Sequence, residues 1–207
     1  MRWLLRGLVG LTVGTAVAVA GCGGNSSTGG AGGSSATSSS SATTSSGGDP
    51  QTPPQGATAL KAWLAKGYYK SWKCEPAVHA SRAPSPHGFD RVCSNKLIEE
   101  NASGTGNWPE GAAAVKELHT SVTSNTVGYA VYLKTAADSA AGASWYWYEQ
   151  VPSDSPAPHD ANGIVADGLG TGGPPQTICV SCHGLAGTTA ADTPTPGGRD
   201  FVFTPVQ

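Results

Sequence analysis

The sequence predicts an α+β domain that is mainly β, with an antiparallel sheet and a few short helices beside it. Three observations support this prediction: apolar side chains alternate along several short segments, helical spacing occurs only in two short segments, and the alternating segments follow one another at hairpin spacing. The folded domain is expected to run from Ala57 to Gln207. Its length of about 150 residues is enough for one hydrophobic core.

Two short helices are expected ahead of the sheet. In the first, Thr58 is the expected N-cap, and apolar residues then recur at helical spacing at Leu60, Trp63, Leu64, Tyr68 and Trp72. The second is expected over residues 96–100, with Ser94 as its cap.

The strands are expected in five segments: 111–122, 127–134, 144–151, 163–168 and 200–206, the last stopped by Pro205. In the first segment, alternation places Val115, Glu117 and His119 on one face and Ala114, Lys116 and Leu118 on the other. In the aromatic segment it places Trp145, Trp147 and Glu149 opposite Tyr146, Tyr148 and Gln150.

The first residues are typical of an export signal. Arg2 and Arg6 precede an apolar stretch, Gly7 to Ala20, which is short and rich in glycine for a membrane span. Its end, Val-Ala-Gly-Cys at 19–22, resembles a bacterial lipobox. We therefore expect residues 1–21 to be a lipoprotein signal peptide and lipidated Cys22 to anchor the protein to a membrane of the bacterial cell envelope, outside the cytoplasm. The alternative is an ordinary secretory signal, cleaved elsewhere.

Residues 22–56 are rich in glycine and serine, so they are expected to form a disordered tether between the lipid and the domain. The formal net charge of the chain is -2, which offers no electrostatic attraction to nucleic acid.

The five cysteines divide by position. Cys22 is taken by the lipid, and Cys74 and Cys93 most simply form a disulfide, since export leads to an oxidising compartment. Such a bridge stabilises by about 3 kcal/mol in the chain-entropy model. Two free buried thiols are the alternative.

The remaining cysteines lie in Cys179-Val-Ser-Cys182-His183, near the C-terminus. This is the spacing for covalent attachment of haem c through both sulfurs, with the histidine as an iron ligand. A redox dithiol is a rival interpretation, but it normally has a long helix after the motif, and GLAGTTAADTPTPGG is a poor helix. A zinc site would need two more ligands, and the chain has no second close pair of Cys or His.

The sixth iron position is not a methionine, because Met1 is the only one and leaves with the signal peptide. A histidine, a lysine, another donor or an open position remain. Of the other histidines, His79, His87 and His159 lie in proline-rich or turn-like sequence and are expected to be exposed loop residues, and His119 lies on a strand.

Four stretches resemble the cytochrome P-460 family in their order along the chain: WPEGAAAVKEL (108–118), SWYWYEQVP (144–152), CVSCH (179–183) and DFVFT (200–204). The resemblance covers most of the domain. It implies a mono-haem c-type protein on an antiparallel sheet, usually a homodimer. In that family, cytochrome P-460 oxidises hydroxylamine and has a lysine joined to the haem, whereas beta-type cytochromes c-prime lack this bond and bind NO or CO at a five-coordinate iron.

The family lysine falls on Lys116, which is the candidate haem cross-link; a lysine paired with a carboxylate at the pocket rim is the alternative. Glu149 is the candidate distal acid that accepts protons, and an exposed strand-end glutamate is its alternative. Trp145, Trp147 and Tyr148 are expected mainly in the core.

The expected function is oxidation of hydroxylamine or a similar small nitrogen compound, with electrons passed to another cytochrome. Two alternatives remain open. One is a non-catalytic cytochrome that binds NO or CO or transfers electrons, and the other is a haem-free redox protein that uses Cys179 and Cys182.

Overall fold

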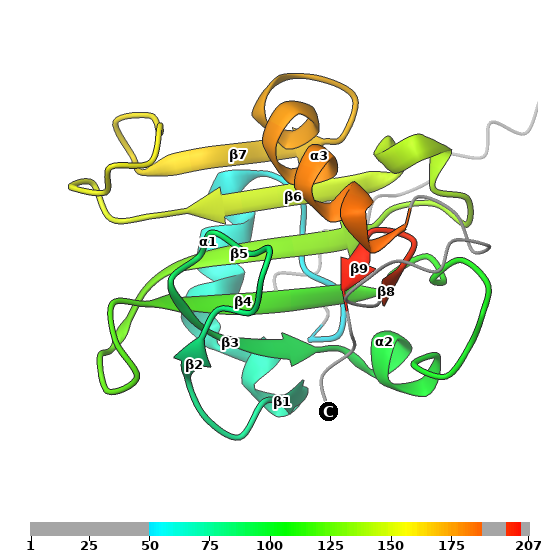
Figure 1. The fold of residues 1–207 in the computed structure, drawn as a ribbon, viewed down its shortest axis with the longest axis horizontal. Coiled ribbons are helices and arrows are strands. Elements are labelled where there is room, and N and C mark those ends of the chain that lie inside the picture. Colours follow the sequence, from blue (N-terminus) through cyan, green and yellow to red (C-terminus); the bar gives the residue numbers. More distant parts are fainter. Residues whose placement is uncertain (1–49, 188–197, 204–207) are drawn as a thin grey trace, which may run out of the picture. The chain divides into compact units, whose positions relative to one another are not determined.

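A seven-stranded antiparallel sheet organises the residues that the computed structural model describes, 50–187 and 198–203 (Figure 1). Its strands, in spatial order, are β1 (Lys73–Cys74), β3 (Phe89–Ser94), β4 (Ala113–His119), β5 (Thr126–Lys134), β6 (Trp145–Gln150) and β7 (Ile164–Leu169), and β2 (His79–Ala80) also pairs with β3. The sheet and its short helices confirm the predicted α+β, mainly β, class.

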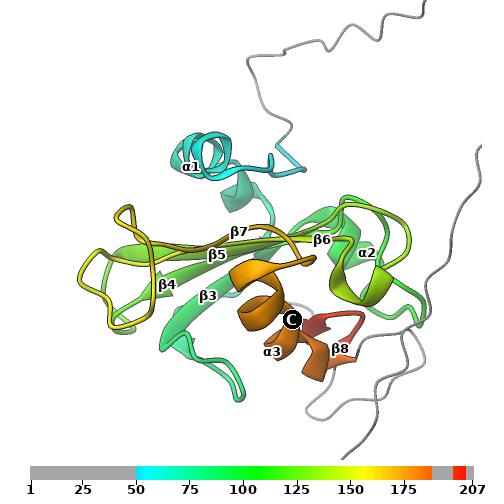
Figure 2. The ribbon, with the colours of Figure 1, turned by 90° about the horizontal axis from the view of Figure 1, so that it is seen from above.

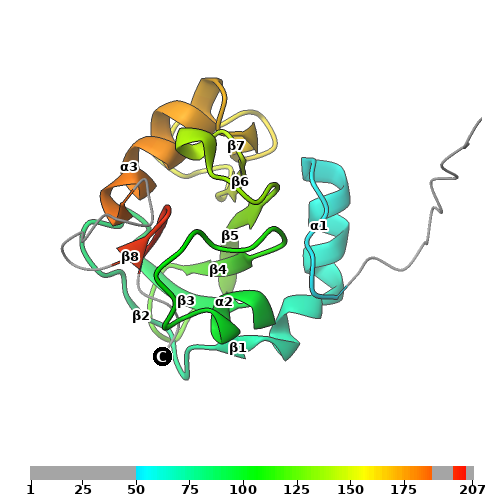
Figure 3. The same ribbon diagram turned by 90° about the vertical axis from the view of Figure 1, so that its right-hand side faces the viewer.

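Helical segments lie on both faces of this sheet (Figures 2 and 3). One face carries α1 (Ala57–Lys66), which is followed by η1 (Tyr68–Ser71). The opposite face carries the π-helical η3 (Pro175–Val180), α3 (Ser181–His183), η4 (Gly184–Ala186) and the small hairpin of β8 (Gly198–Arg199) and β9 (Val202–Phe203). The short α2 (Lys96–Glu100) follows β3, and η2 (Ala140–Gly142) lies between β5 and β6.

The alternation predicted for the strands is confirmed by the two cores. On the α1 face, Val115, Val131 and Tyr148 pack with Leu60 and Trp63 of the helix. On the opposite face, Trp145 and Trp147 pack with residues of the C-terminal segments, including Cys179 and Phe201. Successive side chains of one strand therefore serve two different cores.

Both predicted helix caps are wrong by a residue or two. Helix α1 begins after Gly56, whose φ is +87°, and its first free amides are satisfied by Tyr146 Oη and Asp167 rather than by Thr58. Helix α2 is capped by Asn95, whose Oδ1 accepts the N–H of Ile98, because Ser94 still belongs to β3.

Strand β3 was not predicted, since FDRVCS has two charged side chains among six residues and does not alternate by hydropathy. Both charges are paired in the structure: Asp90 accepts from Ser81 Oγ and Arg91 donates to Glu117. The predicted closing strand is also different, because among the described residues β9 pairs only with β8 and not with the main sheet. Pro205 lies outside those residues.

The predicted disulfide is confirmed: Cys74 and Cys93 are bonded and face each other across β1 and β3. The bridge is part of the α1 core, since Cys93 is fully buried in it and Cys74 packs against it.

Contacts with the domain begin earlier than Ala57. Trp72 Nε1 donates to the carbonyl of Pro50, and Asn95 Nδ2 donates to that of Gln51. The predicted signal peptide, Cys22 and the tether up to residue 49 lie outside the described residues. Within the described part of the chain, no helix combines the length and the apolar character needed to cross a bilayer.

Candidate functional site

A groove runs between the sheet and the C-terminal helical segments. It consists of two hollows, an inner one with a cavity volume of about 70 Å³ and a wider one of about 690 Å³. The two hollows are continuous, because Val92, Lys116, Tyr132 and His183 line both of them. We call this space the groove.

Two rows of laterally paired residues form the floor of the groove. One row crosses β3 to β6 as Val92, Lys116, Ala130 and Glu149, and the next crosses them as Ser94, Ala114, Tyr132 and Trp147. Because adjacent strands lie about 4.8 Å apart, the backbones at Lys116 and Glu149 are about 10 Å apart, and both side chains project from the same face. The alanines between the larger side chains leave space above the sheet.

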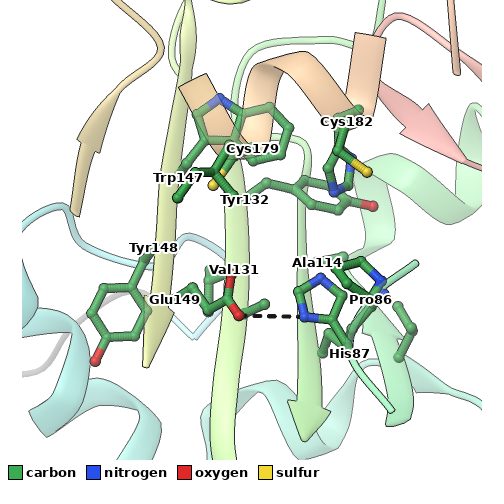
Figure 4. Close-up of a pocket in the computed structure, with 15 residues that line it drawn as sticks. Pro86, His87, Ala114, Val131, Tyr132, Trp147, Tyr148, Glu149, Cys179 and Cys182 are labelled. Carbon is green, nitrogen blue, oxygen red and sulfur yellow. Dashed lines mark ion pairs between the residues drawn. The ribbon is translucent and has the colours of Figure 1, made fainter. Parts of the chain in front are cut away.

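Cys179 and Cys182 line the inner hollow from η3 and α3, as Figure 4 shows. Both are free thiols; Cys179 is buried and Cys182 is half-buried. Burial raises the pKa of Cys179 to about 12, and burial also raises the pKa of Cys182. Neither thiol is therefore a ready thiolate at neutral pH.

His183 follows directly and is held by a backbone carbonyl. Its Nδ1 lies 2.8 Å from the carbonyl oxygen of Phe201. Since a carbonyl only accepts, the hydrogen is assigned to Nδ1, which leaves the Nε2 lone pair free. Burial lowers the pKa of His183 to about 3, although the Phe201 carbonyl acts in the opposite direction, so the ring is neutral. A neutral imidazole oriented through its other nitrogen is the usual form of a metal-ligating histidine.

Aromatic rings enclose this imidazole. The centroids of Trp147, Phe203 and Tyr132 lie 4.6, 5.4 and 5.8 Å from that of His183. Trp147 was expected in the core and is buried there, but it also lines the groove.

Lys116 lies in the groove and is paired with a carboxylate. Its Nζ is 3.3 Å from Asp90 Oδ2 and 3.3 Å from Ser85 Oγ, and 21% of its side chain is exposed. Both features considered from the sequence, a lysine facing the pocket and a lysine paired with an acid, are thus present together. The cross-link to haem stays a prediction.

Glu149 lines the inner hollow opposite the two cysteines and lies next to His87 (Figure 4). His87 Nδ1 is 3.4 Å from Glu149 Oε1, and the exposed fractions of the two side chains are 12% and 13%. Glu149 is therefore not an exposed strand-end residue. The expectation that His87 is an exposed loop residue is wrong, because its loop folds back over the sheet.

Sequence reasoning missed His87 as a member of the site. Its immediate neighbours, Pro86 and Gly88, indicate a loop, and the only signal of its position would have been strand β3 starting at Phe89.

Of the other histidines, one lines the wider hollow and two lie outside the groove. His79 is not a simple loop residue, since its Nε2 is 2.9 Å from Glu75 Oε2 and it lines the wider hollow. His119 is on the α1 face, as its alternation with Lys116 predicted, and its Nδ1 contacts the carbonyl of Ser124. His159 contacts the carbonyl of Asp160 between β6 and β7.

No protein-family model matches this chain, and a search of curated proteins found no significant match.

Proposed function

We propose that the groove holds one haem c, attached through Cys179 and Cys182, with His183 as the proximal iron ligand. The observation that supports this most directly is the orientation of His183. Its Nδ1–H is engaged by the Phe201 carbonyl, so Nε2 carries the lone pair, and His183 lines the same hollow as both cysteines. The groove also suits a flat, largely apolar group, because its wider hollow, at about 690 Å³, lies in the ligand-pocket range of about 300–1,000 Å³, and the rings of Tyr132 and Phe203 beside His183 form part of its wall.

A bound haem would supply an iron that binds small ligands and exchanges electrons. The chain's own residues would then position and shield it. Trp147 and Tyr132 would pack against the ring system and exclude water, and Ala114 and Ala130 would leave it room. Phe201 would keep the proton on His183 Nδ1.

The enzymatic form of the proposal is oxidation of hydroxylamine or a similar small nitrogen compound. It is supported by the side chains opposite the cysteines. Glu149 is close enough to His87 for a proton taken from a substrate to pass between them and on toward the loop surface. Lys116 is on the same face, as a cross-linking lysine would have to be.

A second candidate is a cytochrome that binds NO or CO without catalysis, and one observation favours it. Lys116 is the cation of an ion pair with the buried Asp90. An ammonium in that position is not a nucleophile, so a cross-link would require the pair to be broken first.

The haem-free dithiol is the least supported candidate. Burial raises the pKa of both thiols, which opposes thiolate chemistry. The helical segment after the motif also ends at Ala186, whereas a redox dithiol usually begins a long helix.

The proposal also includes a lipid anchor at Cys22, a location in the cell envelope, a partner cytochrome that accepts electrons, and a homodimer. They rest on the sequence and on its resemblance to the cytochrome P-460 family.

The decisive experiment expresses the full chain with a c-type cytochrome maturation system and measures intact mass and haem staining after denaturing electrophoresis. Wild type should carry one haem that survives denaturation. Cys182→Ser should weaken or abolish that retention, while the neighbouring Ser181→Ala should leave it unchanged. A wild-type mass equal to the processed polypeptide alone would contradict the proposal.

The same sample separates the two haem functions. A reduced absorption band shifted strongly to the red, with a mass lower by two hydrogens than simple attachment requires, would support a Lys116 cross-link and the enzyme. An ordinary high-spin spectrum that changes when CO is added would support the gas-binding alternative. Lys116→Arg is the matched variant, since it retains the charge beside Asp90 but cannot form the same bond.

A further inference from the structure

A fully buried ion pair connects the sheet to the C-terminal hairpin. Lys134 Nζ, at the end of β5, is 3.0 Å from Asp200 Oδ2, and neither side chain has any exposed surface. Ser139 Oγ bridges the pair, because it accepts from Lys134 and donates to Asp200. Burial lowers the pKa of Lys134, and the Asp200 carboxylate acts in the opposite direction.

Asp200 belongs to a turn that is held from several sides. Its Oδ2 accepts the backbone N–H of Trp108 at 2.8 Å, and the N–H of Phe201 donates to the carbonyl of Gly187 at 2.8 Å. Next to it, the Arg199 guanidinium lies 3.8 Å from the centroid of the Trp108 ring. These contacts connect the turn to the segments before β4 and after α3.

The turn has an unfavourable backbone conformation. Asp200 and Phe201 have φ values of +46° and +66°, in the left-handed region that is uncommon for residues other than glycine. Such a conformation persists only where the surrounding structure enforces it. Two consecutive residues in this region turn the chain sharply, and this turn directs the Phe201 carbonyl to His183 Nδ1.

A buried ion pair is a poor way to gain stability alone, because desolvation of the two charges offsets most of their attraction. Two apolar side chains of the same size would stabilise the core at least equally well. What a charge pair adds is a directional constraint, and here the constrained residue directly precedes the one that contacts His183.

We propose that Lys134 and Asp200 are positioning residues for His183: their ion pair holds the Asp200–Phe201 turn so that the Phe201 carbonyl accepts the His183 Nδ1–H. In this way a side chain on the rigid sheet sets the tautomer of the histidine and its strength as an iron donor. The functional meaning rests on the proposed haem site, whereas the link from Lys134 to the His183 tautomer does not need haem.

The test compares Asp200→Asn with Asp167→Asn. Asp200→Asn keeps the side-chain shape and removes the charge that Lys134 pairs with. Asp167→Asn is the matched control, because Asp167 also carries structural hydrogen bonds, to Tyr146 Oη and the Ala57 N–H, but lies on the α1 side of the sheet. Lys134→Met with Asp200→Asn, and the milder Ser139→Ala, serve if Asp200→Asn does not fold.

Two readouts apply to each variant. Nitrogen-15 NMR of the purified protein reports which ring nitrogen of His183 carries the hydrogen. Where haem is bound, the midpoint potential and the iron–histidine stretching band report donor strength. Asp200→Asn should lower the Nδ1–H population, shift the potential upward and shift the stretching band to lower frequency, because a weaker hydrogen bond makes the imidazole a weaker donor. Asp167→Asn should change none of these.

An Asp200→Asn protein that folds and retains the wild-type tautomer and potential would overturn the inference, as would equal shifts in Asp167→Asn. If the purified protein has no haem, the proposed function fails while the NMR readout still decides this inference.

Discussion

The two faces of the sheet differ although the same strands build them. On the α1 face, Val115 and Val131 are buried in a closed core with Leu60 and Tyr69. On the other face, Lys116 and Ala130, their immediate neighbours in sequence, line an open groove. One strand therefore contributes to stability with every second side chain and to a binding site with the others. We therefore expect substitutions on the α1 face to change the free energy of unfolding, and substitutions in the groove to change the binding or turnover of ligands.

Leu60→Ala should have the largest effect on the free energy of unfolding. Leu60 is fully buried, so its truncation should lower that free energy by about 2–5 kcal/mol. Thermal or urea unfolding measures this loss. Haem retention and the visible spectrum of the folded protein should stay as in wild type, and a changed spectrum would show that the two faces are coupled.

Removal of the disulfide should have a similar but smaller effect. Cys74→Ser with Cys93→Ser opens a bridge that closes the α1 core, and the expected loss is about 3 kcal/mol, seen as a melting temperature lower by several degrees. The double variant avoids a lone thiol. Identical melting curves for oxidised wild type and this variant would mean that the bridge does not contribute to stability.

At the wider end of the groove, the Glu75–His79 pair should make stability depend on pH. Burial raises the pKa of Glu75, but the Val92 N–H, His79 and Arg82 outweigh it and hold the pKa below 4.5. Burial lowers the pKa of His79, but the Ala80 carbonyl and Glu75 outweigh it and hold the pKa above 6.5.

The histidine contribution is therefore complete below pH 6.5 and is lost as the pH rises through its folded pKa. The glutamate contribution is complete above pH 4.5 and is lost as the pH falls through its folded pKa. His79→Asn should lower the free energy of unfolding by about 1 kcal/mol between these values and by less on either side. Unfolding in urea across this range tests it, and a difference that does not vary with pH would contradict it.

His87→Leu should have the smallest effect on stability and a clear effect on hydroxylamine turnover. The His87–Glu149 pair is a single contact of 3.4 Å and leucine fills a similar volume, so its loss should cost folding at most about 1 kcal/mol. If the pair moves protons, hydroxylamine turnover should fall and its pH profile should change, while CO affinity stays similar. His159→Leu is the control, because His159 lies away from the groove. Unchanged turnover in His87→Leu would contradict the role of His87 and would mean that Glu149 accepts protons without it.

The sequence was most informative where one physical rule decides the outcome. The alternation of 113–119 correctly separated Lys116 from His119, and the cysteine positions correctly predicted the Cys74–Cys93 bond. It was least informative where a polar residue is buried by a distant partner. Strand β3 was not predicted because charged residues such as Asp90 and Arg91 are usually exposed. Their partners, Ser81 and Glu117, are known only from the fold.

By itself, the sequence determined which side chains share a face of each strand, because the side-chain period of a strand is two residues wherever the strand lies. It also placed Cys179, Cys182 and His183 together, because they are neighbours in the chain. Only the tertiary structure decided that His87 contacts Glu149. It also decided that Lys134 pairs with Asp200, 66 residues away and next to the residue whose carbonyl contacts His183. Those contacts depend on which strands pair and where loops return, and no local pattern encodes that choice, since burial and charge pairing are properties of the assembled fold.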